Sequence, residues 1–333
     1  MTEATVPRQR VSSGIQPSGQ LHLGNYFGMM KRMIEFQAQH ELFCFIVNYH
    51  ALTTVQDGKT LRQGTVDAAM DFLALGLDPE QSIFWVQSDV QEVTELTWIL
   101  SCVTSMGLLE RCHSYKDKIA KGIAPSHGLF AYPVLMAADI LIYQSNVVPV
   151  GRDQKQHVEV TRDLALKFNN EFGEVFTIPE PFIPDEVAVV PGLDGQKMSK
   201  SYGNTIELFG DMKETKARIM KIVTDSKGLE DPKDPSACNV FALFKLFADD
   251  ARRQEMEANY RGGNYGYGHA KKALAAAFEE TFAPFRARRA ELQAHPDYVE
   301  EVLRNGAERA RAEAAKTLDR ARDAVGLSFT GRP

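Results

Sequence analysis

Short apolar runs alternate with amphipathic stretches through the first half of the chain, and this alternation limits the folds that the sequence can adopt. The apolar runs that predict strands are 42–48, 83–87 and 146–150. The stretches whose periodicity predicts helices are 26–39, 61–75 and 156–169. Repetition of strand and helix favours an α/β fold, in which a Rossmann-like parallel sheet is covered by helices on both faces. Such a sheet binds its ligands at the carboxyl ends of the strands.

The second half of the chain has a different pattern. A proline-rich, extended stretch at 179–191 leads into a glycine-flanked loop, and beyond residue 210 only helices are predicted, at 211–223, 240–248, 268–280 and 299–325. A length of 333 residues suggests roughly two domains. We therefore expect a sheet domain over 1–210, a smaller all-helical domain over 211–300, and a C-terminal helix in 301–333 that packs back on the body.

Composition excludes several classes of protein. The net charge of −6 argues against a general nucleic-acid binder, although residues 251–333 carry 15 Lys+Arg against 12 Asp+Glu and allow a polyanionic partner there. No apolar run approaches the roughly 18 residues of a membrane helix, and the N-terminus has no apolar signal region. The four cysteines form no C-x-x-C pair that would predict a zinc cluster. We expect a cytoplasmic protein with no membrane contact.

The first motif with chemical potential is the glycine-bearing turn at 13–26, which lies between an extended run and a predicted helix. Its glycines allow the backbone to approach a bulky ligand, and the free N–H groups of the helix start favour a phosphate or ribose. His22 and Asn25 add side-chain donors. The alternative is an ordinary Pro-Ser-Gly turn followed by a helix cap.

The second motif is Lys197-Met198-Ser199-Lys200-Ser201 in the later glycine-flanked loop. Two lysines three residues apart form a cationic clamp suited to a triphosphate whose charge shifts during phosphoryl or nucleotidyl transfer. The alternative is a solvated basic turn. A Walker-type phosphate loop is excluded because Thr53 stands where the leading glycine would have to precede Gly58-Lys59-Thr60.

The third motif is the apolar stretch 132–143. Pro133 predicts a first helical turn, and Tyr132, Met136, Asp139 and Tyr143 share one stripe at a period of 3.6 residues. A carboxylate on such a helix needs a hydrogen-bond donor. The donor could be a ligand N–H, or Asp139 could be a structural carboxylate paired with a core backbone donor or an arginine.

Taken together, the motifs resemble those of class I aminoacyl-tRNA synthetases, whose HIGH and KMSKS signatures stand in this order. Gln16-Pro17-Ser18-Gly19 precedes His22-Leu23-Gly24-Asn25, which occupies the place of HIGH, and Lys197–Ser201 is the KMSKS sequence. Asn25 in place of the last histidine is typical of the tryptophan-specific branch, as is the stretch around Asp139. The resemblance extends from Ser13 to the region of Gly326.

This resemblance implies a set of site residues. The catalytic residues implied are His22, Asn25, Lys118, Lys197 and Lys200. The residues implied to bind the nucleotide are Gln16, Pro17, Ser18, Gly24, Asn25, Gly151, Arg152, Asp153, Val190, Lys197, Met198, Ser199, Lys200 and Ser201. The residues implied to bind the amino acid are His50, Tyr132, Met136, Asp139 and Gln154, with Asp139 accepting the indole N–H. His157 is instead expected to fix local packing on a helix face.

The resemblance also implies substrates and partners. These are ATP, with Mg²⁺ carried by the nucleotide and no dedicated metal site, L-tryptophan, tRNA(Trp) bound by the helical region, and a second copy of the chain in a homodimer. Ser12 departs from the pattern, because bacterial members often have an aromatic residue there. Two alternatives stay open: a tyrosine-specific synthetase, which shares both signatures, and a catalytically silent relative that binds RNA or another protein.

Overall fold

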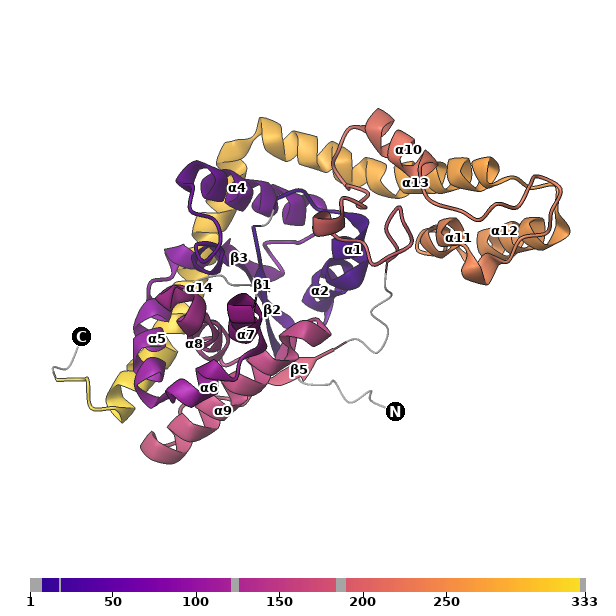
Figure 1. Cartoon of the computed structure of the whole chain (residues 1–333). Coiled ribbons are helices and arrows are strands. Elements are labelled where there is room, and N and C mark those ends of the chain that lie inside the picture. The colour runs from indigo at the N-terminus through magenta and orange to yellow at the C-terminus, as the bar shows by residue number, and fades with distance from the viewer. Residues whose placement is uncertain (1–7, 18, 121–125, 184–189, 330–333) are drawn as a thin grey trace, which may run out of the picture. The chain divides into compact units, whose positions relative to one another are not determined.

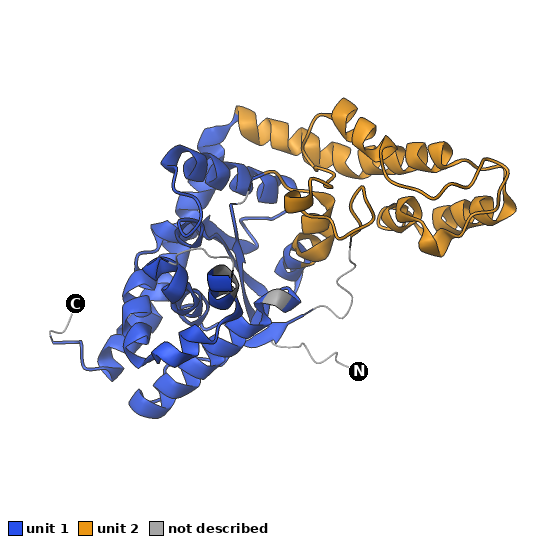
Figure 2. Cartoon of the chain, in the orientation of Figure 1, with its two compact units in different colours: residues 1–19, 33–185, 295–333 blue, residues 20–32, 186–294 orange. Residues whose placement is uncertain are grey.

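The computed structural model describes residues 8–17, 19–120, 126–183 and 190–329, without the side chains of Ser114, Asp117, Lys118 and Asp153. The chain forms two compact units. Unit 1 comprises residues 1–19, 33–185 and 295–333, and unit 2 comprises residues 20–32 and 186–294 (Figure 2).

Unit 1 is built on a five-stranded parallel sheet, which confirms the predicted α/β class. The strands are β1 (Arg10–Ile15), β2 (Glu41–Ile46), β3 (Ser82–Val86), β4 (Val147–Pro149) and β5 (Glu180–Phe182). Their order, β3-β2-β1-β4-β5, reverses direction between β1 and β4. In doubly wound sheets the ligand crevice lies at this switch point, at the carboxyl ends of the strands.

Helices surround these strands in unit 1 (Figure 1). They are α3 (Asn48–Ala51), α4 (Gly58–Ala74), α5 (Glu92–Val103), α6 (Met106–Glu110), α7 (His113–Ala120), α8 (His127–Leu141), α9 (Lys155–Phe172) and α14 (Pro296–Ala324). A continuous core of buried apolar side chains joins β2 and β3 to α5, α8, α9 and α14. The apolar runs of β2 and β3 are buried along almost their whole length, as strands covered on both faces should be.

Pro133 does not lie in the first turn of its helix, so that prediction is wrong. Helix α8 begins six residues earlier, at His127, because the Ser126 side chain accepts a hydrogen bond from the N–H of Leu129 and caps the helix there. Pro133 therefore lies inside α8, where it cannot donate to the preceding turn.

Unit 2 is mainly helical. Its helices are α1 (Leu23–Asn25), a π-helical turn (Tyr26–Met30), α10 (Met212–Met220), α11 (Asn239–Phe244), α12 (Asp250–Gly262) and α13 (Tyr267–Ala294), and α2 (Lys31–Glu35) crosses into unit 1. The single helix predicted over 26–39 is thus broken into pieces. The π-helical turn coincides with aromatic contacts from two consecutive residues, Tyr26 on Phe282 and Phe27 on Phe247.

The boundary between the units differs from the predicted one at residue 210. Residues 190–210 group with the helices because Arg286 of α13 donates to the carbonyls of Leu208 and Gly210. The C-terminal helix α14 belongs to unit 1 and packs against β3. None of the described helices combines the length and the apolar character that crossing a membrane requires.

Candidate active site

A buried carboxylate lies on α8 in unit 1. Asp139 is only 2% exposed, and its Oδ2 atom lies 2.9 Å from Nε2 of His50. The Nε2 atom of Gln87 donates to both carboxylate oxygens, at 2.9 and 2.8 Å. A carboxylate removed from water requires such donors. Its protein partners are therefore an imidazole and an amide, and not the backbone donor or arginine of the structural alternative.

The sheet places both partners of this carboxylate. Gln87 directly follows β3, and His50 lies on α3, just after the neighbouring strand β2. Gln87 also accepts a hydrogen bond from the Tyr49 N–H at 3.0 Å, and Asn48 and Ser88 bond reciprocally beside it, at 2.8 and 3.1 Å. Two adjacent strand ends are thereby linked to each other and to α8.

Aromatic and apolar side chains adjoin this network. The Tyr132 hydroxyl lies 2.6 Å from Nε2 of His157, and its ring meets the His50 ring edge-on, with centroids 6.0 Å apart. Met136 is half-buried and packs against the apolar cluster that contains Val148. His157 is buried on α9 and holds Tyr132, which fits the packing role predicted for it.

Tyr143 does not share the helical stripe with Asp139, because α8 ends at Leu141. It is buried in the core, where its ring stacks on Phe43 with centroids 5.1 Å apart. Burial raises the pKa of its hydroxyl well above the usual range, and the charges of Asp139 and Glu92 raise it further. Tyr143 is therefore a neutral core residue.

In unit 2 the last part of the glycine-bearing turn, residues 21–24, lies against the loop that carries the lysine motif and the residues that follow it. The Leu23 N–H donates to the Ile206 carbonyl at 3.0 Å, and the Leu208 N–H donates to the Leu21 carbonyl at 2.9 Å. A Cβ atom at Gly24 would lie 3.0 Å from the His22 ring and 3.3 Å from Cβ of Met198. Gly24 thus allows the two segments to approach closely. An ordinary Pro-Ser-Gly turn followed by a helix cap would not require this close approach.

The electrostatics of His22 follow from this contact. Its side chain is buried, and burial, together with the nearby charge of Lys200, lowers the pKa of His22 to about 4. The imidazole is therefore neutral at pH 7. It can donate or accept a hydrogen bond, as predicted for this side chain, but it carries no positive charge at that pH.

The lysine motif alternates between buried and exposed side chains. Met198 is buried, and its N–H donates to the carbonyl of Val190, also buried, at 2.9 Å. Lys197, Lys200 and Ser201 are exposed, and Ser199 is half-buried. Met198 and Val190 thus anchor the loop, while the exposed residues Lys197 and Lys200 lie at its surface.

Comparison with known proteins identifies the family. The family model described as "tRNA synthetases class I (W and Y)" matches residues 6–283, which is more than half of the chain. The chain belongs to the class I tRNA synthetases. A "Tryptophan--tRNA ligase" of Rhodopirellula baltica is 55% identical over 318 residues, covering 96% of this chain and 99% of that relative. A "Tryptophan--tRNA ligase" of Campylobacter jejuni strain RM1221 is 54% identical over 318 residues, which cover 96% of this chain and 100% of that relative.

A solved structure supports the same assignment. The tryptophanyl-tRNA synthetase of Campylobacter jejuni, crystallised with ADP and tryptophan, matches with a TM-score of 0.92 and 53% sequence identity. The match covers 96% of this chain and 100% of that one. The parallel sheet and helical region described above are therefore those of a class I synthetase.

Other predicted site residues of this synthetase follow neighbouring strands. Gln16 and Pro17 come directly after β1, and Gly151, Arg152 and Gln154 come after β4, which pairs with β1 at Val11 and Val147. Both groups therefore leave the sheet at the carboxyl ends of adjacent parallel strands. Ser18 and the side chains of Lys118 and Asp153 lie outside the described residues.

Two predicted positions have protein partners of their own. The Oδ1 atom of Asn25 accepts a hydrogen bond from the His22 N–H at 3.1 Å, so this asparagine fixes the turn. Ser12, which departs from the family pattern, is buried, and its hydroxyl lies 2.5 Å from that of Ser145. Ser12 is therefore hydrogen-bonded to another residue of unit 1, at a position where bacterial members of the family often have an aromatic side chain.

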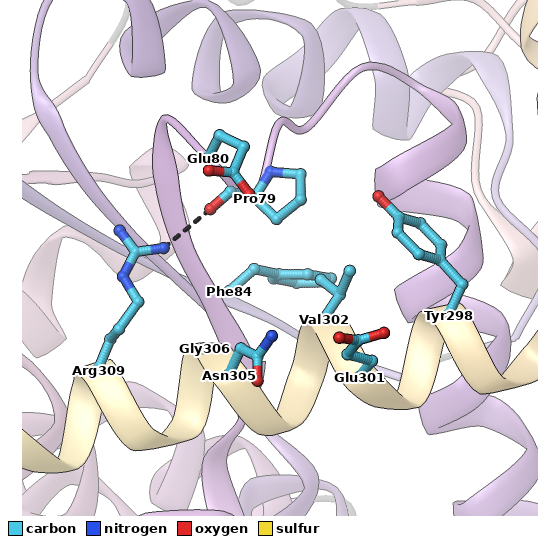
Figure 3. A pocket seen from close by; sticks show the side chains of 9 residues that line it. All are labelled: Pro79, Glu80, Phe84, Tyr298, Glu301, Val302, Asn305, Gly306 and Arg309. Atoms are coloured by element: carbon cyan, nitrogen blue, oxygen red, sulfur yellow. Dashed lines mark hydrogen bonds between the residues drawn. The ribbon is translucent and has the colours of Figure 1, made fainter.

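The predicted site contains neither a cluster of metal ligands among the described residues nor the pocket found in unit 1. The described residues contain no group of three or more His, Cys, Asp or Glu that could hold a metal ion. A pocket of about 520 Å³ in unit 1 includes none of the predicted site residues and lies where α14 meets β3 (Figure 3). Its lining residues are Pro79, Glu80, Phe84, Tyr298, Glu301, Val302, Asn305, Gly306 and Arg309.

Sequence reasoning missed Gln87. An available signal was its position immediately after a buried strand, where a parallel sheet presents ligand groups. Its pairing with Asp139 could not be inferred, because 52 residues separate the two in sequence.

Proposed function

We propose that this synthetase joins L-tryptophan to tRNA(Trp), using ATP. The observation that carries the proposal is the buried Asp139 carboxylate, held between His50 and Gln87 beside aromatic and apolar side chains. An indole ring has an apolar body and a single N–H donor, and this arrangement offers contacts for both. The relatives that are 54–55% identical and named "Tryptophan--tRNA ligase" support the same substrate.

In the first step an oxygen of the tryptophan carboxylate attacks the α-phosphorus of ATP. The new C(O)O–P bond forms the aminoacyl adenylate, and the bond from the α-phosphorus to the bridging oxygen breaks, so that pyrophosphate leaves with the electron pair. The attacking carboxylate is already ionised at neutral pH, and no general base is needed. Catalysis then depends on orientation and on neutralising charge at the phosphates.

This chain's residues fit those two tasks. Lys197 and Lys200 provide the positive charge that meets the phosphates, and neutral His22 provides a hydrogen bond. Lys118 is the further cation that the family resemblance implies. Mg²⁺ bound to ATP supplies additional charge neutralisation, and it needs no dedicated protein site.

The substrates are held by residues from the strand ends and the glycine-bearing turn. Gln16, Gly24 and Asn25 seat the nucleotide, Gly151 and Asp153 hold its ribose, and Gln154 meets the polar end of the amino acid. Pro17, Ser18, Arg152 and the segments around Val190 and Met198 complete the nucleotide site. In the second step a hydroxyl oxygen of the terminal tRNA ribose attacks the activated carbonyl carbon and forms the ester. The bond from that carbon to the phosphate oxygen breaks, AMP leaves with the electron pair, and the hydroxyl proton is released to water.

Selectivity follows from the indole acceptor. A site built to hydrogen-bond a substrate N–H rejects analogues without it by about 10⁴–10⁵, so no proofreading step is needed. The tyrosine-specific alternative would place a phenol hydroxyl, which can both donate and accept, against the Asp139 side chain. The close relatives named for tryptophan favour the indole.

The partners follow from this activity. We assign tRNA binding to the helices between residues 211 and 294, and we expect the enzyme to act in the cytoplasm as a homodimer. Exposed Trp98 and Met106, on α5 and α6, are the apolar side chains that we would test first at the subunit contact.

The decisive experiment is amino-acid-dependent exchange of pyrophosphate into ATP. The proposal expects exchange with tryptophan, at most weak exchange with tyrosine or phenylalanine, and charging of tRNA(Trp) after addition of tRNA. Exchange with tyrosine alone would identify the other specificity of the family, and absence of exchange with every amino acid would identify a silent relative.

A further inference from the structure

The side chain of Asn204 lies at the centre of the loop that carries the lysine motif. It is 3% exposed, and its Oδ1 atom accepts a hydrogen bond from the Ser199 N–H at 2.8 Å. Its Nδ2 atom donates to Oδ1 of Asp194 at 2.8 Å and to the Lys197 carbonyl at 3.2 Å. One buried amide therefore bonds to Lys197 and to the residue before Lys200.

The loop is shaped around this amide. A Cβ atom at Gly192 would lie 2.2 Å from Nδ2 of Asn204, so only glycine leaves room for it. The Leu193 N–H donates to the Asn204 carbonyl at 3.0 Å. The hydrogen bond from Asn204 is also the main reason that the pKa of Asp194 is lowered. The contacts on both sides of the lysine motif thus converge on one residue.

Helix α10 fixes the backbone on either side of Asn204. The Nη2 atom of Arg218 donates to the Gly203 carbonyl, and its Nε atom donates to the Thr205 carbonyl, both at 2.8 Å. At the other end of the loop, the Val223 N–H donates to the Leu193 carbonyl at 2.7 Å. The planar guanidinium therefore holds two carbonyls in a fixed relation, which a lysine could not do.

We propose that Asn204 is a positioning residue for Lys197 and Lys200, and that Arg218 fixes the backbone from which Asn204 acts. This inference rests on the proposed function, because it concerns the lysines that stabilise the adenylation transition state. Asn204 is bonded to the loop and is not assigned to any reacting atom. Its amide fixes the backbone from which the exposed lysine side chains extend.

The first test is Asn204→Asp, assayed by tryptophan-dependent exchange. Aspartate keeps the acceptor for the Ser199 N–H, but it loses both donors and sets an oxygen against Asp194 and the Lys197 carbonyl. A displacement of about 1 Å in a catalytic group costs roughly 100-fold, so we expect kcat to fall by about that factor. The Kd for tryptophan, measured by calorimetry, should not change, because its site is built from unit 1.

A double variant separates positioning from added charge. Asp194→Asn combined with Asn204→Asp has the net charge of the wild type and restores a donor–acceptor pair between the two residues. It does not restore the bond to the Lys197 carbonyl. We expect kcat to recover in part, while the single Asn204→Asp variant stays low.

Asn169 provides a control for destabilisation. Its amide ties another loop in the same way, accepting from the N–H groups of Val175 and Phe176 and donating to the Phe176 carbonyl. Asn169→Asp should lower the melting temperature without lowering kcat below that temperature. If it lowered kcat as much as Asn204→Asp did, Asn204 would have only a general structural role and the proposal would be overturned.

Arg218→Lys keeps the proposal testable if Asn204→Asp does not fold. Lysine keeps the charge but cannot bond both carbonyls in the same geometry, and loss of one hydrogen bond corresponds to about a tenfold loss of kcat. Wild-type rates in both Asn204→Asp and Arg218→Lys would refute the inference. Absence of exchange in the wild-type protein would refute the proposed function instead.

Discussion

The side-chain nitrogen of Gln87 lies within 2.9 Å of both carboxylate oxygens of Asp139, so one amide holds the whole carboxylate in a single orientation. Gln87 is itself 1% exposed and is fixed by the Tyr49 N–H. A hydrogen-bond acceptor discriminates between ligands only when it is held in place. The strand end after β3 therefore fixes the carboxylate that we propose as the indole acceptor.

Replacement of Gln87 by methionine should weaken tryptophan binding. The change preserves the size of the side chain and removes the donor from a buried carboxylate, which costs about 1–3 kcal/mol, or roughly tenfold or more in Kd. Calorimetric titration with tryptophan measures the effect. Gln91→Met, at an exposed position just before α5, is the matched control, and equal affinities in the two variants would contradict the role given to Gln87.

Replacement of Asp139 by leucine should remove the preference for tryptophan over phenylalanine. Without the carboxylate the proposed site loses the acceptor that would distinguish an indole from a phenyl ring, and the selectivity of about 10⁴–10⁵ expected of such a site should be lost. The ratio of kcat/KM values in pyrophosphate exchange reports this directly. The exposed Asp163→Leu on α9 controls for a general effect. An unchanged ratio would mean that another group reads the indole.

Replacement of Lys197 by alanine should reduce pyrophosphate exchange by about 100- to 1,000-fold, the usual cost of removing one transition-state donor. Because the Lys197 side chain is exposed and Asn204 bonds to its backbone carbonyl, the fold and tryptophan binding should persist. Lys213→Ala, on exposed α10 surface, should leave the rate unchanged. Wild-type turnover in the Lys197 variant would remove this lysine from the mechanism.

Some of these features could be predicted from sequence, and the reasons differ from residue to residue. The runs at 42–48 and 83–87 predict strands because a strand buried on both faces is apolar throughout. The contact between Gly24 and Met198 was expected only through the family signatures, since nothing local in either segment specifies its partner. The π-helical turn at 26–30, which breaks the helix predicted over 26–39, leaves no signal in the periodicity of the sequence. The predicted domain boundary at residue 210 differs from the observed one because residues 20–32 are hydrogen-bonded to residues that follow the lysine motif.

The stability of the protein should depend on pH through His22. Its pKa is about 4 in the folded protein, against 6.5 for an unperturbed histidine. The unfolded chain therefore binds the proton first, and the free energy of unfolding should decrease as the pH falls from about 6.5 to about 4. In His22→Gln this contribution should be absent. Urea denaturation across this range compares the two, with the exposed His127→Gln as control, and identical pH profiles for wild type and His22→Gln would contradict the prediction.

Replacement of Gly306 by alanine should separate α14 from the sheet. A Cβ atom there would lie 1.8 Å from the Phe84 carbonyl oxygen, a distance that no side-chain rotation can relieve. Figure 3 shows Gly306 on the helix beside the segment that carries Phe84. Because Phe84 belongs to β3, the helix must move away and expose core side chains, at a cost of about 2–5 kcal/mol in the free energy of unfolding.

Gly268→Ala is the matched control for this change. Gly268 lies in the first turn of α13, and a Cβ atom there would meet nothing within 4 Å. Alanine in such a helical position should be neutral or stabilise by about 0.5–1 kcal/mol. Urea denaturation distinguishes the two substitutions, and equal stabilities would show that α14 does not depend on close approach to β3.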